Sequence, residues 1–405
     1  MRIKTLVLIW ICWVVIVLGF QSMVKMRFGP QGPDHVLGWT AEATKPDSND
    51  ENKFLSHPFM NNQTAWDSQF YLSIALEGYD GKNVESIDFN DKTYSLSYAF
   101  LPLYPMAIRF LSFLPIQLGM DPIAAAVLAG IIISALGTLL GIIAFYFLVK
   151  DDFDEEGILR MVFYFLIFPS SFFLLQVYTE GLFIGLSFTC LALIRYKKLW
   201  YASLFAALAV LTRAVGISLL IPLIIAIFKD VDWEAYKSKH LSNLKLAVKG
   251  LPALMPLLAF LVWKFSYLGT SFNIVEKNFF ARGFFNLHTT IYFWRLGIGS
   301  MLSGNPQAIV YFLIEIAAIL LGLIACRLTI RKDPGMAIFG FLVILISLTS
   351  GPAQGMIRYI LPIPSVFIFL GLLGKNKVFD RAWVITSILL MGMMATLFTF
   401  DKWVA

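Results

Sequence analysis

Long runs of apolar residues constrain this 405-residue chain more than any other feature. A run of roughly 20 such residues, wound as an α-helix, spans the hydrocarbon core of a bilayer. Lipid offers no partners for backbone polar groups, so only helices or closed barrels can cross it. Hydrophobic residues make up 58% of the sequence and charged residues only 14%. The sequence therefore predicts an all-α polytopic membrane protein with a single domain over residues 1–405.

The positions of these runs predict about eleven membrane helices. The first run, 5–24, resembles a signal peptide, but no small-residue cleavage site follows it, so we interpret it as a retained helix. The other helices are expected near 122–149, 158–177, 180–195, 199–212, 214–228, 250–268, 306–326, 335–350, 357–374 and 382–400.

Segment 99–119 decides the predicted topology, because it is apolar but contains prolines and Arg109. If it crossed the membrane, every later turn would change sides. The turns rich in lysine and arginine would then face outward, against the positive-inside rule. These turns are 195–198, 229–249, 327–332 and 375–381. We therefore expect 99–119 to be a re-entrant or interfacial element within one long outer loop, residues 25–121.

The net charge of +6 follows from this topology, since the basic residues are spread over several inner turns. A nucleic-acid-binding protein would concentrate them in one patch, so no nucleic-acid partner is predicted. The three cysteines show no CxxC spacing and are interpreted as small core residues. No glycine-rich nucleotide loop occurs, which argues against a nucleotide-sugar domain.

The outer loop contains the stretch that we consider most informative, 66–79, followed by 99–105. Thr64 and Asp67 have the spacing of a helix capping box, and Gly78 comes where a helix over 65–77 would need a left-handed cap. We expect an amphipathic helix on the outer membrane surface. Asp67 then has two open interpretations, a cap of its own helix or a catalytic carboxylate.

Further charged residues are predicted at the same membrane face. Glu180 begins a helix just after the chain emerges, and Arg213 and Arg358 occupy outer turns. A carboxylate base with arginines that neutralise a phosphate would fit this set. The alternative is that the arginines only extend from helix ends towards water. Glu315 lies near the middle of an apolar run and is expected to be a buried hydrogen-bonding acid.

No metal-ligand set is predicted. His57 and His288 lack a second histidine or cysteine at a ligand spacing. The acidic residues at 88–91 could contact a cation, and Asp152 and Asp154 form a DxD pattern, but such loop acids are usually solvated. The residues thus identify no cofactor and leave a divalent cation open.

Several blocks of the sequence resemble the GPI mannosyltransferase II (PIG-V-like) family, within the GT-C superfamily of membrane glycosyltransferases. The resemblance covers most of 60–220 and, more loosely, the region after Arg358. The blocks are 66–79, 99–105, 178–183, 211–216 and 358–364.

This resemblance implies a GT-C-type fold and an enzyme that takes mannose from a polyprenyl (dolichyl) phosphate carrier on the outer or lumenal face. Transfer to an acceptor hydroxyl would proceed with inversion, with Asp67 as the general base. Arg213 and Arg358 would stabilise the leaving phosphate, and Glu180 would orient a sugar hydroxyl or an arginine. The substrate-binding positions implied are Trp66, Tyr178, Glu180, Arg213, Arg358 and Tyr359.

The acceptor is expected to be a glycan or glycolipid. The short loops and the lack of an evident retrieval signal leave a GPI acceptor open, with a plasma-membrane enzyme if prokaryotic and an endoplasmic-reticulum enzyme if eukaryotic. One alternative is a transferase of another sugar; another is a transporter or flippase, which should place its charged residues near the bilayer midplane. Convergence of the outer charged residues on one outward cavity would favour the enzyme.

Overall fold

The computed structural model describes residues 3–29, 32–45, 52–229, 242–352 and 354–404, and for 242–249 only the backbone. Helices dominate these ranges, and their only sheet is one two-stranded antiparallel hairpin. The predicted all-α class is confirmed. The part of the inner turn 229–249 that covers 230–241 lies outside the described residues.

Four helices of the described chain are long and apolar enough to cross a membrane, or five if one bent pair forms a single span. The pair is bent by 72° between Gly250–Phe265 and Tyr267–Asn278. The four are α1 (Ile3–Arg27), α6 (Pro122–Val149), α15 (Pro306–Thr329) and α19 (Lys377–Thr399). These helices agree with an integral membrane protein, while the number of eleven crossings stays a prediction.

Shorter helices complete the bundle, and several begin and end where the apolar runs do. The runs 158–177 and 357–374 are each broken into two helices, and the helix over 287–302 was not predicted. These elements are α7 (Glu155–Leu166), η3 (Ser171–Leu175), α8 (Glu180–Arg195), α9 (Leu199–Thr212), η4 (Ala214–Leu219), α10 (Leu220–Lys229), α12 (Ser242–Phe265), α13 (Tyr267–Asn278), α14 (Leu287–Leu302), α16 (Pro334–Thr349), α17 (Met356–Tyr359) and α18 (Pro364–Leu373).

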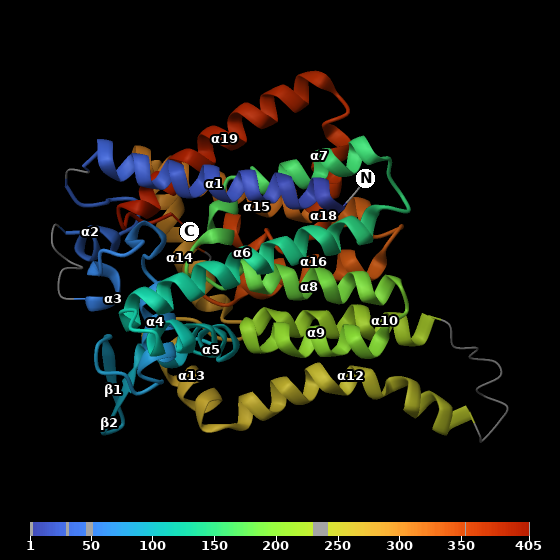
Figure 1. The fold of residues 1–405 in the computed structure, drawn as a ribbon, viewed down its shortest axis with the longest axis horizontal. Helices are drawn as coiled ribbons and strands as arrows, with labels where there is room; N and C mark the ends of the chain where they lie inside the picture. Colours follow the sequence, from blue (N-terminus) through green and yellow to red (C-terminus); the bar gives the residue numbers. More distant parts are fainter. Residues whose placement is uncertain (1–2, 30–31, 46–51, 230–241, 353, 405) are drawn as a thin grey trace.

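The outer loop folds into small elements that gather at one end of the helices, at the left of Figure 1. Its helix α5 is too short to be among the candidate spans and exposes Met106, Phe110 and Phe113, as an interfacial helix would. The elements are α2 (Thr40–Ala43), α3 (Lys53–Ser56), η1 (Asn61–Gln63), α4 (Ser68–Leu76), β1 (Ser86–Phe89), β2 (Lys92–Ser95), η2 (Leu96–Ala99) and α5 (Leu103–Gln117).

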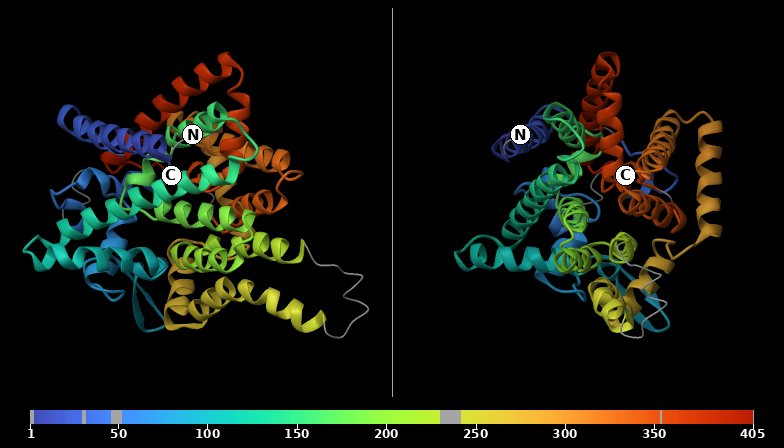
Figure 2. Two further views of the ribbon diagram at one scale, coloured as in Figure 1. Left: turned by 45° about the vertical axis from the view of Figure 1, so that its right-hand side comes forward. Right: turned by 90° about the vertical axis from the view of Figure 1, so that its right-hand side faces the viewer.

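Helix α14 runs across the direction of the long helices and lies at the edge of the bundle, as the right-hand view of Figure 2 shows. It exposes Ile291, Tyr292 and Leu296. It packs against α15 and α16. The apolar runs did not predict α14, because its hydrophobic stretches are short.

Glycines bring α6 and α8 into close backbone contact. A Cβ atom on Gly181 would lie 2.2 Å from the Ser134 carbonyl oxygen, and one on Gly137 would lie 2.6 Å from the Gly181 backbone. Small residues allow this approach between membrane helices. The Ser134 hydroxyl also donates to the Tyr178 carbonyl at 2.9 Å. These contacts fix the beginning of α8, where Glu180 is located.

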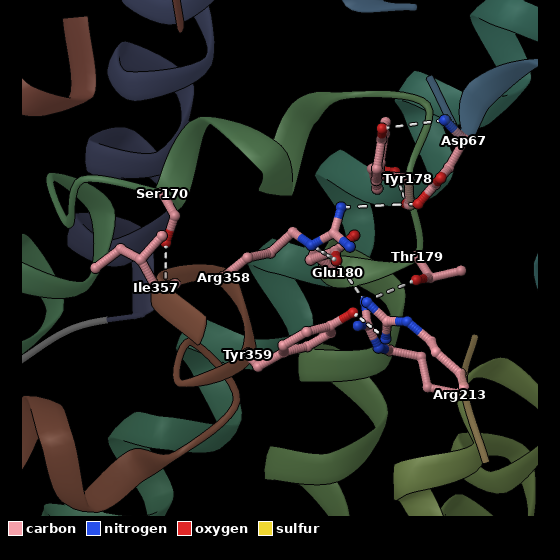
Figure 3. A network of polar contacts seen from close by, with 11 residues as sticks. Asp67, Ser170, Tyr178, Thr179, Glu180, Arg213, Ile357, Arg358 and Tyr359 are labelled. Carbon is pink, nitrogen blue, oxygen red and sulfur yellow. Dashed lines mark hydrogen bonds and ion pairs between the residues drawn. The ribbon is translucent and has the colours of Figure 1, made fainter. Parts of the chain in front are cut away.

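The break between α17 and α18 is held by buried polar contacts. Glu315, on α15, is fully buried and accepts a hydrogen bond from the Met356 backbone N–H, which confirms it as a buried hydrogen-bonding acid. The Ser170 hydroxyl donates to the Ile357 carbonyl at 2.7 Å (Figure 3). Arg358 and Tyr359 are therefore presented by a short helix whose backbone is anchored on both sides.

The acidic loop residues have structural partners. Asp152 pairs with Arg195 at 2.8 Å, and Asp154 accepts a hydrogen bond from the Gly157 N–H at the start of α7. Residues 88–91 belong to the β1–β2 hairpin and its turn. No group of three or more His, Cys, Asp or Glu side chains in the described ranges could hold a metal ion.

Candidate active site

Asp67 lies at the start of α4, beside the arginine of α17. Its Oδ2 is 3.7 Å from Arg358 Nη1, and its backbone N–H donates to the Tyr178 hydroxyl at 3.2 Å. The Tyr178 hydroxyl in turn donates to the Ala65 carbonyl. Trp66 has φ of 49°, a left-handed conformation that is rare for a bulky residue. The backbone at 65–67 is therefore held in place by a side chain more than 100 residues away.

The predicted capping box is wrong. Helix α4 begins at Ser68, and the Asp67 side chain makes no capping hydrogen bond. The Thr64 hydroxyl instead donates to the Asn61 carbonyl. Gly78 does have a left-handed φ of 90°, as expected. Because the left-handed Trp66 interrupts the helix before its first turn, the carboxylate of Asp67 is free to face other partners.

Glu180 joins the two predicted arginines. Its Oε1 accepts a hydrogen bond from Arg213 Nη1 and lies 3.3 Å from Arg358 Nε. The Glu180 side chain is only 3% exposed. Arg213 also donates to the Thr179 hydroxyl at 3.1 Å. Figure 3 shows Arg358 reaching between Asp67 and Glu180, so two carboxylates and two guanidinium groups form one network.

A third arginine, Arg282, meets this network through Tyr359. Its Nη1 donates to the Tyr359 hydroxyl at 2.9 Å, and no ion pair of Arg282 occurs among the described residues. The guanidinium carbons of Arg213, Arg358 and Arg282 lie 5.2, 5.4 and 5.8 Å from the Tyr359 ring centroid. Burial alone would raise the pKa of Tyr359, but the three arginines outweigh it and lower the pKa to about 8. The potential at the Tyr359 hydroxyl is therefore positive, and this part of the cavity suits an anion.

The pKa of the Asp67 carboxyl is raised. Desolvation by the surrounding protein is the main cause, Arg358 partly opposes it, and the Glu180 carboxylate adds to the rise. The side chain still has 31% of its surface exposed. Asp67 thus combines access with a proton affinity above that of an ordinary aspartate, as a general base requires.

These residues converge on a large cavity of about 1560 Å³. Glu180 is not among the lining residues and lies behind the arginines, against a separate small pocket. The predicted site residues that line the large cavity are Trp66, Asp67, Tyr178, Arg213, Arg358 and Tyr359. Convergence on one cavity is the arrangement expected of an enzyme.

Among the charged residues of the cavity wall that were not predicted from the sequence are Glu276, on α13, and Arg282, in the following turn. The Arg282 N–H donates to the Glu276 carbonyl at 2.8 Å. Arg282 lies between two pairs of phenylalanines, 279–280 and 284–285, which also line the cavity. A single arginine between two aromatic pairs in a membrane protein is the sequence signal that could have identified Arg282.

The comparisons with known proteins agree with the resemblance noted from the motifs. The family model described as mannosyltransferase (PIG-V) matches residues 3–274. No curated protein sequence matches the chain.

Two solved structures have a similar overall arrangement at low sequence identity. ArnT from Cupriavidus metallidurans, solved with undecaprenyl phosphate, is 14% identical at a TM-score of 0.47, covering 98% of this chain and 76% of that one. The Archaeoglobus fulgidus oligosaccharyltransferase is 12% identical at a TM-score of 0.45, covering 95% of this chain. This chain spans about half, 53%, of the oligosaccharyltransferase.

The family model extends over most of the chain, including the outer loop with Asp67, the start of α8 with Glu180 and the turn with Arg213. The described structure places Asp67 and Arg213 on the wall of one cavity, with Glu180 behind them in contact with Arg213. The chain therefore belongs to the mannosyltransferase (PIG-V) family and is a membrane glycosyltransferase.

Proposed function

We propose that the protein transfers mannose from a polyprenyl phosphate carrier to a hydroxyl of a glycan or glycolipid acceptor, with inversion, at the outer or lumenal membrane face. The observation that carries this proposal is the position of Asp67. Its carboxylate makes no capping hydrogen bond and lies on the cavity wall, 3.7 Å from Arg358, one of the arginines that surround Tyr359. A base and an anion site thus line the same cavity, and a displacement on a sugar phosphate needs both.

In the proposed reaction the acceptor hydroxyl oxygen attacks the anomeric carbon of the sugar. The bond between that carbon and the phosphate oxygen breaks, and polyprenyl phosphate leaves with the electron pair. Asp67 takes the proton of the acceptor hydroxyl. Arg213 and Arg358 stabilise the charge that develops on the phosphate.

Glu180 is proposed to position the arginines rather than a sugar hydroxyl. It is buried, it contacts both guanidinium groups, and it does not line the cavity. The carrier identity is supported by the positive potential around Tyr359 and by the phenylalanines beside Arg282, of which Phe284 is 82% exposed. An anionic head next to an apolar surface fits a phosphorylated isoprenoid.

The test is sugar transfer by the purified protein in liposomes, with radiolabelled polyprenyl phosphate mannose and a crude acceptor lipid extract. Asp67→Asn should lose about 100- to 10,000-fold in rate, the usual contribution of a general base. Asp88→Asn is the matched control, because Asp88 is an exposed acid of the same outer loop that does not line the cavity. Transfer by Asp67→Asn at the wild-type rate would refute the assignment of the base.

A second outcome concerns the donor. If folded wild-type protein transfers no mannose but does transfer another carrier-linked sugar, the enzyme class stands and the sugar is wrong. If it transfers none and instead moves the labelled lipid across the bilayer, the transporter alternative replaces the enzyme.

A further inference from the structure

Three tryptophans from distant parts of the sequence meet in the wall of the cavity next to Asp67. They are Trp39 before α2, Trp66 before α4 and Trp403 in the tail after α19. Their ring centroids are 4.8 to 5.8 Å apart, and all three pairs meet edge to face. We call them the tryptophan wall. The function proposed above gives a role only to Trp66.

Hydrogen bonds between the outer loop and the C-terminal tail hold this wall in place. Trp66 Nε1 donates to the Lys402 carbonyl at 3.3 Å. The Trp403 backbone N–H donates to Asp34 Oδ2 at 2.9 Å, and its indole N–H donates to the Tyr311 hydroxyl at 3.2 Å. Two of the three indole rings are therefore fixed through their polar edge.

Trp39 differs from the other two. Its side chain is 39% exposed, and its indole N–H makes no hydrogen bond with a described residue. Gln69 follows Trp66 by three residues and lines the same cavity, and its side-chain carbonyl oxygen accepts a hydrogen bond from the Asn52 amide at 2.5 Å. The Gln69 amide nitrogen therefore remains available as a donor. An aromatic ring with neighbouring donors offers both an apolar face and hydrogen bonds to one ligand.

A neutral pyranose ring matches this combination. One face of such a sugar presents C–H bonds of slight positive charge, which pack on the negative face of an aromatic ring. Its hydroxyl groups lie around the edge, where they can accept from the Trp39 indole N–H and the Gln69 amide. A phosphate would instead be drawn to Arg213, Arg358 and Arg282, so the two ligand chemistries belong to different parts of the cavity.

The strain at Trp66 supports a function for the wall. A left-handed conformation of a large non-glycine residue is unfavourable and persists only where the surrounding structure imposes it. In this conformation the Trp66 indole packs in the tryptophan wall, and the next residue in the chain is Asp67, the proposed base. Ring position and carboxylate position are thus coupled along the backbone.

We propose that the tryptophan wall binds a neutral pyranose of the acceptor, next to the hydroxyl that is glycosylated. This inference rests on the proposed function. In an inverting displacement the nucleophile and the leaving group lie on opposite sides of the anomeric carbon, and the base belongs to the side of the nucleophile. Because the phosphate is assigned to the arginines, we assign the acceptor to the tryptophan wall, whose Trp66 directly precedes Asp67 in the chain. The acceptor is therefore a carbohydrate.

The first experiment is saturation-transfer-difference NMR on the full-length protein in phospholipid nanodiscs, which contain no sugar detergent. The probes are methyl α-D-mannopyranoside and methyl β-D-galactopyranoside. At least one should show saturation transfer to its ring protons. Trp39→Ala should weaken that signal about three- to tenfold, the scale of one aromatic contact, and Trp39→Phe should keep most of it.

Two control variants separate this inference from the proposed reaction. Trp200→Ala removes an exposed tryptophan of α9 that is not on the cavity wall, and it should leave the signal unchanged. Asp67→Asn should also keep the signal, because the sugar contacts do not need the base. If the wild-type protein binds the probe but transfers no sugar, the tryptophan wall stands and the proposed reaction fails.

A transfer assay decides which sugar occupies the wall. Trp39→Ala should raise the half-saturating amount of acceptor extract about three- to tenfold, with the donor requirement and the maximal rate unchanged within twofold. A rise for the donor alone would assign the wall to the donor sugar and overturn the proposal. Absence of saturation transfer to either probe in the wild-type protein, or an unchanged signal in Trp39→Ala, would also overturn it.

Discussion

Replacing Glu180 by glutamine tests the charge network most directly. The substitution keeps the shape of the side chain and removes its charge, so the buried Arg358 and the half-buried Arg213 lose their shared partner. Glu180 is 3% exposed, accepts a hydrogen bond from Arg213 and lies 3.3 Å from Arg358 Nε. At an effective dielectric constant of 20, one ion pair at this separation is worth about 5 kcal/mol. Removing one partner of a buried pair costs about 3–5 kcal/mol. We therefore expect Glu180→Gln to destabilise the protein by about 3–5 kcal/mol.

The assay is an equilibrium unfolding titration with sodium dodecyl sulfate in mixed micelles, followed by circular dichroism. Glu156→Gln is the matched control. Glu156 also lies in the first turn of a helix and pairs with an arginine, Arg160, at 2.7 Å, but its side chain is 80% exposed. An exposed pair of this kind contributes about 0.2–1 kcal/mol. Burial is thus the main difference between the two variants.

A double-mutant cycle completes the test. Removing Arg213 as well, in Glu180→Gln/Arg213→Gln, deletes one of the two stranded charges. The double variant should therefore be more stable than the sum of the single effects predicts, by about 2 kcal/mol. The reasoning would be refuted if Glu180→Gln cost no more than Glu156→Gln, or if the two effects were additive.

Two further predictions concern the reaction itself. The transfer rate should increase with pH through the pKa of Asp67, because the base acts in its deprotonated form. Since that pKa is raised, the increase should occur at a higher pH than for an ordinary aspartate. A rate that is flat from pH 4 to 8 would contradict this prediction. Arg282→Gln should raise the half-saturating donor concentration about 10- to 100-fold, the value of a charge-assisted hydrogen bond to phosphate, whereas Arg109→Gln, an exposed arginine of α5, should leave it unchanged.

Local sequence patterns predicted much of the helical framework. Helices α6, α8 and α9 begin and end at the predicted positions, 122–149, 180–195 and 199–212. Apolar runs and the glycines or charged turns between them are local features, so they can be recognised without the fold. The sequence likewise placed Glu315 as a buried acid, because a carboxyl in an apolar run has few alternatives.

The same local reasoning failed at Asp67. A capping box was predicted from the spacing between Thr64 and Asp67. The left-handed conformation of Trp66 prevents a helix from starting before it, and α4 begins only at Ser68. The conformation of Trp66 depends on Tyr178 and on the C-terminal tail, which are distant in sequence. Propensity rules contain no term for such contacts.

The sequence by itself determined that this protein is a helical membrane protein and, through its motifs, which family it belongs to. In a membrane each helix satisfies its own backbone hydrogen bonds, so its existence follows from a short stretch of sequence. Only the tertiary structure decided that Glu180 lies behind the arginines, that Arg282 joins them, and that Trp39 and Trp403 stand beside Asp67. These are contacts between residues up to several hundred positions apart, and their formation depends on how the helices pack rather than on the pattern within any one of them.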